Sequence, residues 1–181
     1  PVPRDLLDAT GRMVAEHVAF FSVAQICRVL DAFAASAVRS DPQAAEMFAS
    51  AGASLASGSR ELSAQDCAMA VRAFAKCRVH DEGLLVAVAT RLRESEVRAA
   101  LDAKEIVSSI YGFAKFTSQD TSLFDLLSIE VRRRLHGMDV PLVSGALASL
   151  AKAGISSPVL TSRAAVQLRR KEPAEMDAAP L

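Results

Sequence analysis

Basic side chains recur in this sequence at spacings that could align them along one surface. In three of four copies of a short motif, a lysine stands two residues after the motif's large apolar residue, and three adjacent arginines occupy positions 132–134. Lys and Arg side chains can hold phosphate groups, and Arg or Tyr can stack on unpaired bases. These residue types therefore indicate a surface for RNA or for an acidic partner.

Two sets of candidate contact residues follow from this pattern. The first set lies on the predicted exposed side of the segments that contain the motif: Arg72, Lys76, Tyr111, Lys115 and Lys152. The second set lies at the ends of the segments that follow: Arg91, Arg93, Arg132, Arg133, Arg134, Arg169 and Arg170, with Lys171 beside them. A simpler interpretation of both sets is a solvated helix face, whose basic residues are favoured near the C-terminus by the helix dipole. Three adjacent arginines exceed what the dipole needs, so residues 132–134 give the strongest indication of a nucleic-acid or acidic-partner contact.

Enzymatic chemistry is not indicated. The sequence has no recognisable Ser/His/Asp set, paired-carboxylate site or Gly-rich phosphate loop, so we expect a non-enzymatic protein without a cofactor. Cys77 and His80 lie three residues apart, but a zinc site needs about four ligands and no second pair stands near them. We therefore expect no metal site.

Composition and charge narrow the possible classes further. Of the 181 residues, 51% are hydrophobic and 23% are charged, as in globular proteins, and the formal net charge is zero. Zero net charge argues against an indiscriminate polyanion binder but allows one charged face. No apolar run approaches the ~18–20 residues that span a bilayer. The three cysteines form no close CxxC pair, which favours a reducing compartment.

The elements that would position the basic residues form a four-fold repeat. The similar stretches VLDAFAASAV, AVRAFAKCRV, SIYGFAKFTS and ALASLAKAGI each contain one large apolar anchor: Phe33, Phe74, Phe113 and Leu150. Successive anchors are 41, 39 and 37 residues apart, a period typical of stacked helical hairpins. A small residue precedes each anchor and would let a neighbouring helix backbone approach closely: Ala32, Ala73, Gly112 and Ser149.

Helix-capping residues recur in register with the anchors. Favoured N-cap types stand eleven positions before each anchor, at Ser22, Ser63, Asp102 and Asp139. Three of these are followed by a capping-box partner: Gln25, Asp66 and Glu105. A second cap follows each anchor by seven or eight residues, at Asp41, Asp81, Asp120 and Ser157. Each repeat therefore predicts two antiparallel helices.

These patterns predict an all-α fold, an α-solenoid of about nine helices arranged as stacked antiparallel hairpins with about 37–41 residues per repeat. We expect a partial repeat or N-terminal capping helix at residues 1–20 and a flexible tail at 172–181. Between them lie four repeats, at about residues 22–62, 63–101, 102–138 and 139–171. The Gly/Ser-rich residues 51–59 predict a loop insertion that accounts for the longer first period.

The repeat length and the AFA core resemble the octotricopeptide and heptatricopeptide helical-repeat proteins of organelles, which often accompany a RAP domain. The matching residues are Val29–Ala34, Val71–Lys76, Ile110–Lys115 and Leu147–Lys152, and the resemblance covers about residues 20–170. Members usually serve RNA processing, stability or translation in mitochondria or plastids, and some are built into organellar ribosomes. No α/β RAP domain follows the last repeat here, so the resemblance does not extend to a nuclease-like activity.

We therefore expect a non-enzymatic, RNA-contacting helical-repeat protein of a mitochondrion, with a plastid as the second choice. It would be a component of a ribonucleoprotein such as the mitochondrial ribosome, and its partners would be ribosomal RNA or an organellar transcript and other protein subunits, without a membrane span. The alternative is a protein–protein scaffold or assembly subunit of a large organellar complex, for example a respiratory one. Zero net charge favours this alternative, whereas the recurring lysine and the resemblance favour RNA.

Overall fold

The computed structural model describes residues 4–36, 42–116 and 120–176. This part of the chain contains ten α-helices, three short 3-10 turns and no β-strand, so the predicted all-α class is confirmed. The helices are α1 (Arg4–His17), α2 (Val23–Ala35), α3 (Pro42–Ser57), α4 (Ala64–Cys77), α5 (Glu82–Arg93), α6 (Ser95–Ala100), α7 (Ala103–Lys115), α8 (Thr121–Arg134), α9 (Val140–Lys152) and α10 (Pro158–Met176). The 3-10 turns are η1 (Val18–Phe20), η2 (Ser59–Glu61) and η3 (Leu135–Gly137).

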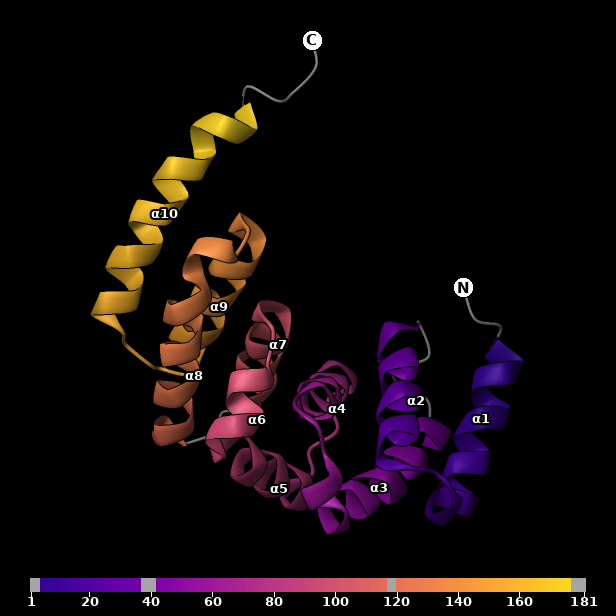
Figure 1. Ribbon diagram of the computed structural model, residues 1–181. Helices are drawn as coiled ribbons and strands as arrows, with labels where there is room; N and C mark the ends of the chain where they lie inside the picture. The colour runs from indigo at the N-terminus through magenta and orange to yellow at the C-terminus, as the bar shows by residue number, and fades with distance from the viewer. Residues whose placement is uncertain (1–3, 37–41, 117–119, 177–181) are drawn as a thin grey trace.

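The helices stack in two layers that curve together as an arc (Figure 1). The first helices of the repeats, α2, α4, α7 and α9, pack on one another along the inner side. The second helices, α3, α5, α8 and α10, follow the outer side, and α1 packs before α3 in that layer. One continuous hydrophobic core runs between the layers. This is the stacking expected of an α-solenoid, in which each repeat is covered by its neighbours.

Local capping fixes where the helices begin. At the start of α4, the Ser63 hydroxyl accepts the Asp66 backbone N–H at 3.2 Å, and the Asp66 carboxylate accepts the Ser63 backbone N–H at 3.1 Å. The same reciprocal pair begins α2 and α7, whereas Asp139 caps α9 from one side only. The predicted caps Asp81 and Asp120 are confirmed, and Asp41 lies outside the described residues. In each of these six helices, one orphan N–H of the first turn is thus satisfied by a side chain three positions away.

The four anchors are buried, with at most 3% of each residue exposed. In the second repeat, Phe74 packs edge-on against Phe48 of α3, with the ring centroids 4.8 Å apart and the planes at 77°. Such a tilted arrangement suits the ring quadrupoles and fills the space between the layers. The predicted anchor register is therefore confirmed.

The small residues before the anchors serve helix contacts within the inner layer. A Cβ at Gly112 would lie 2.6 Å from Val71 Cγ2 and 2.9 Å from the Val71 carbonyl oxygen, so α7 and α4 approach at backbone distance there. Ala73 and Ser149 are buried at the corresponding places. Ala32 is exposed, because among the described helices none packs on the inner layer ahead of α2.

The predicted loop insertion at residues 51–59 is wrong. Helix α3 continues to Ser57, and Ala51 and Leu55 are completely buried. Gly52 is required for packing, because a Cβ there would lie 2.1 Å from Asp81 Oδ2 and 3.3 Å from the Phe74 ring. The second helix of the first repeat, α3, has 16 residues against 12 in α5, and this contributes to the longer first period.

Two helical features differ from the sequence-based expectation. The short helix α6 joins α5 to α7, where the first and third repeats have the 3-10 turns η2 and η3. Helix α10 extends to Met176, past the boundary expected near Lys171. Among the described helices, none combines the length and the hydropathy needed to span a membrane.

Candidate nucleic-acid interface

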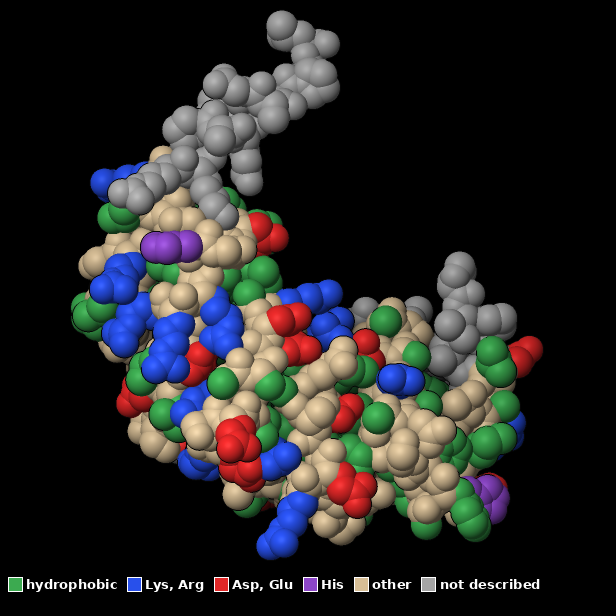
Figure 2. Space-filling view, viewed as in Figure 1, with side chains coloured by type: hydrophobic (Ala, Val, Ile, Leu, Met, Phe, Trp, Pro, Cys, Tyr) green, Lys and Arg blue, Asp and Glu red, His purple; other side chains and the backbone are tan. Residues whose placement is uncertain are grey.

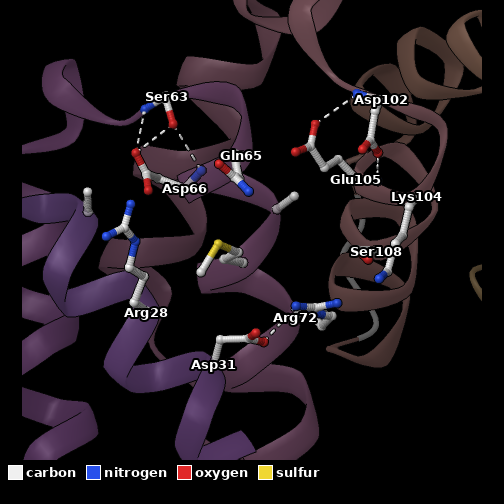
Figure 3. Close-up of a pocket in the computed structure, with 13 residues that line it drawn as sticks. Arg28, Asp31, Ser63, Gln65, Asp66, Arg72, Asp102, Lys104, Glu105 and Ser108 are labelled. Carbon is white, nitrogen blue, oxygen red and sulfur yellow. Dashed lines mark hydrogen bonds and ion pairs between the residues drawn. The ribbon is translucent and has the colours of Figure 1, made fainter. Parts of the chain in front are cut away.

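A hollow of about 590 Å³ on the inner side of the arc contains one member of the first predicted set, Arg72 (Figure 3). On α4, Arg72 donates a hydrogen bond of 2.6 Å to the Asp31 carboxylate on α2. This ion pair joins the first helices of two successive repeats across the hollow. The guanidinium is therefore already neutralised by a protein carboxylate.

The charges that line this hollow are mixed. Its cations are Arg28, Arg72 and Lys104, and its carboxylates are Asp31, Asp66, Asp102 and Glu105. Three of these carboxylates, those of Asp66, Asp102 and Glu105, belong to helix caps, where backbone N–H groups hold them in place (Figure 3). Four carboxylates against three cations make the hollow a poor site for a polyanion.

The other members of the first set do not line the hollow. Lys76 and Lys115 are half-buried at the C-terminal ends of α4 and α7, and Lys152 is exposed at the end of α9. Tyr111 is 37% exposed on α7. Within the described part of the chain, none of these three lysines pairs with a carboxylate, so they remain available to a ligand.

In the second predicted set, Arg91 is held by the protein. Its Nε donates to the Leu62 carbonyl oxygen at 2.9 Å, and its Nη1 pairs with Glu94. These contacts join α5 to the turn that precedes α4. We therefore assign Arg91 a packing role in this structure.

Arg93 is engaged in a similar way. It pairs with the carboxylate of Asp120, the N-cap of α8. Burial acts to raise the pKa of Asp120, but hydrogen bonds from Ser122, from the Leu123 backbone N–H and from Arg93 outweigh it and hold the pKa below its ordinary value. Arg93 thus links the end of one second helix to the start of the next.

The run of three arginines surrounds a buried carboxylate that the sequence analysis did not single out. Glu130 is 3% exposed, and its Oε1 lies 2.8 Å from Arg133 Nη1 and 3.7 Å from Arg98 Nε. Arg134 also pairs with Glu130 and donates to the Ala99 carbonyl oxygen at 2.8 Å. A buried carboxylate is stable only when paired, which explains why cations gather here. One carboxylate is shared by three guanidinium groups, so the cluster keeps a surplus of positive charge.

Arg132 differs from its two neighbours. It is half-buried on α8, and no carboxylate in the described part of the chain pairs with it. Arg169 is exposed on α10 and likewise has no described acidic partner, whereas the side chain of Arg170 lies outside the described residues. The structure therefore divides the predicted set into arginines bound within the protein and arginines left for a ligand.

Positive charge is concentrated toward one end of the chain. Residues 130–171 contain eight Lys and Arg against two acidic residues, a net charge of +6, and the remaining residues carry −6. Figure 2 shows blue side chains gathered over α8 and its neighbours at the C-terminal end of the arc. The zero net charge of the whole chain conceals this separation.

The thiols give no sign of metal or nucleophile chemistry. Burial raises the pKa of Cys67 to about 12 and raises the pKa of Cys27 as well, so both thiols are protonated at neutral pH. The His80 ring packs edge-on against Phe116, with the centroids 5.4 Å apart. Among the described residues, no group of three or more His, Cys, Asp or Glu side chains is placed to hold a metal ion.

Sequence reasoning missed Glu130, Arg98 and Arg163. The first was detectable, because arginines three and four residues after a glutamate lie on the same helix face. Counting charges by segment would have found the basic C-terminal region that includes Arg163. The contact of Arg98 with Glu130 was not detectable, because it joins helices that are far apart in sequence.

A family model described as RNA-editing substrate-binding complex 6 protein matches residues 3–168, which is most of the chain. No curated protein matches the sequence significantly. The matching family differs from the octotricopeptide and heptatricopeptide proteins that the motifs resemble. The match supports the coarser part of that resemblance, namely that the chain is an RNA-associated helical protein.

Proposed function

Because the chain belongs to the family of RNA-editing substrate-binding complex 6 proteins, we propose that it is a non-enzymatic subunit that contacts RNA in an organellar RNA-editing complex. The observation that carries this proposal is the surplus of cations at the C-terminal end of the arc. There, residues 130–171 hold a net charge of +6, and a single buried carboxylate serves three arginines.

The mechanism would be recognition of phosphates by cations at fixed positions. A continuous core holds the helices of the arc, so cations on successive helices keep their spacing without an ordering cost for the backbone. Lys76, Lys115 and Lys152 extend the basic surface along the inner layer. Binding of this kind is strongly salt-dependent, because each neutralised phosphate releases counterions.

The setting of this activity is also part of the proposal. The family description favours an RNA-editing complex over a mitochondrial ribosome, the setting suggested by the resemblance of the repeats. We propose a mitochondrial location, with a plastid as the second choice. RNA and other protein subunits would be the partners.

Binding of the purified chain to fluorescein-labelled single-stranded RNA, measured by anisotropy at several salt concentrations, tests the proposal. We expect an affinity that falls steeply with salt, and a double variant Arg132→Glu/Arg169→Glu that binds more weakly with a shallower slope. The matched control is Arg12→Glu/Arg60→Glu, which reverses two exposed charges far from the basic end. No binding by the wild-type chain at low salt would refute the proposal, as would equal losses in the two double variants.

A protein–protein scaffold is the second candidate, favoured by the exposed face of the N-terminal helix. Leu6 and Met13 are 56% and 55% exposed, and their seven-residue spacing aligns them along one side of α1. Phe20, in the turn η1 that follows, is 86% exposed. Sedimentation of the native protein from organelle lysate, with and without RNase, separates the candidates. Release from a heavy particle by RNase supports RNA contact, and retention with co-sedimenting subunits supports the scaffold.

A further inference from the structure

We propose that a depression between α8 and α10 binds one nucleotide of a single-stranded RNA, with its phosphate on arginines and its base on an apolar floor. This inference rests on the proposed RNA-binding function and names the site and the form of RNA. The depression has a volume of about 560 Å³, within the ~300–1,000 Å³ typical of small-ligand sites.

The walls of the depression come from two helices and a turn. Ser162, Arg163, Val166 and Gln167 lie along one face of α10, because residues three and four positions apart are neighbours on a helix. Gln167 Nε2 donates to the His136 carbonyl oxygen of η3 at 3.4 Å. This hydrogen bond ties the α10 wall to the end of α8, so the shape of the site is set by the fold.

The charge of the lining is of one sign. Arg132 and Arg133 project from α8 and Arg163 from α10, and none of the lining residues is acidic. No carboxylate in the described part of the chain pairs with Arg132 or Arg163, whereas Arg133 is paired with Glu130. The inner hollow, by contrast, contains four carboxylates. The depression is therefore selective for an anion, with two guanidinium groups free to bind it.

The apolar part of the lining indicates that more than a phosphate is bound. Val166 is 51% exposed although it stands among arginines, and the buried Leu135 lines the same depression. A nucleobase can cover such a surface while guanidinium planes stack on its faces and hydroxyl or amide groups meet its edge. Ser162 and Gln167 supply those polar groups.

Single-stranded RNA fits this arrangement better than a duplex. In an A-form duplex the bases are stacked and paired, and their edges lie in a major groove too narrow for side chains. A base can enter the depression only when it is unstacked. An acidic chain such as oligoglutamate could satisfy the arginines but has no planar ring for the apolar floor.

The test measures binding of a labelled oligouridine to the full chain and to the single variants Arg132→Ala, Arg163→Ala and Val166→Asp. We expect each to weaken binding about tenfold, and each arginine variant to reduce the salt slope by about 0.7. Arg60→Ala is the matched control, because it removes one exposed cation that lies outside the depression and far from the basic end. The three variants replace side chains without a described carboxylate partner, and circular dichroism verifies that each is folded.

Three competing probes and a cross-link decide the assignment. Duplex RNA, an oligoglutamate, and an abasic RNA strand of the same length as the oligouridine should each compete poorly with the labelled oligouridine. An oligouridine that contains 4-thiouridine should cross-link to the tryptic peptide of residues 164–169. If the wild-type chain binds RNA and the depression variants change its affinity no more than Arg60→Ala does, this site is overturned while the proposed function stands. If oligoglutamate competes as well as unlabelled oligouridine, the depression is a site for an acidic protein. If the abasic strand competes as well, the base contact is wrong. A wild-type chain that binds no RNA would refute both proposals.

Discussion

Replacing Gly112 by alanine should destabilise the protein although it improves helix propensity. A Cβ at this position would lie 2.6 Å from Val71 Cγ2, 2.9 Å from the Val71 carbonyl oxygen and 3.0 Å from its carbonyl carbon. Glycine to alanine in a helix interior gains about 0.8–1 kcal/mol, whereas overpacking a core costs roughly 1–3 kcal/mol. Two of the three close atoms belong to the backbone and cannot rotate away. We therefore expect the cost to lie near the top of its range, for a net loss of roughly 2 kcal/mol.

Gly145→Ala is the matched control. Gly145 also lies inside an inner-layer helix, α9, but a Cβ there would be 3.6 Å from Val107 Cγ1, an ordinary contact distance. This variant should gain about 0.8–1 kcal/mol from helix propensity alone. The same substitution thus has opposite signs at two positions, and the difference comes from the distance between neighbouring helices.

Urea unfolding followed by circular dichroism measures both effects as shifts of the transition midpoint. Val71→Ala alone should also cost stability, because Val71 is completely buried. In a double-mutant cycle, its coupling with Gly112→Ala should offset only part of the Gly112→Ala loss, because the Cγ2 contact disappears but the carbonyl contact remains. If Gly112→Ala proves as stable as the wild type or more stable, the close approach of α4 and α7 is wrong.

Three further predictions follow. Phe74→Ala should cost about 3–5 kcal/mol in urea unfolding, because the ring is 1% exposed at the centre of the core, and a loss under about 1 kcal/mol would contradict the anchor register. Because the folded-state pKa of Asp120 is lowered, its carboxylate adds stability above the unfolded-state pKa of about 3.9, and this is lost as the pH falls through the folded-state value. Asp120→Asn should therefore be less stable than the wild type near neutral pH, with the gap closing below about pH 4; a constant gap would refute this. A thiol reagent should modify the half-buried Cys77 first, and Cys27 and Cys67, buried with raised pKa values, only on unfolding; equal rates in the native protein would count against their burial.

The sequence predicted the helical elements well because their signals are local. Ser63 and Asp66 form a cap across three residues, and Phe74 recurs at a fixed distance from that cap. Hydrogen bonds between near neighbours and apolar periodicity need no tertiary information. The loop predicted at residues 51–59 is wrong for a tertiary reason. Gly52 leaves room for the Asp81 side chain of the following repeat, and no local pattern reveals that contact.

Sequence alone therefore determined the caps and the buried anchors, which depend on residues within a few turns of one another, and the repeat, which is visible as their recurrence every 37–41 residues. Only the tertiary structure decided which basic residues are available. Arg134 donates hydrogen bonds to Glu130 and to a carbonyl oxygen of α6. Arg132, in contrast, lines the same depression as Arg163, which lies on another helix 31 residues further along the chain. Charge in a sequence is visible, but whether it is neutralised depends on carboxylates and carbonyl groups that folding brings from distant segments.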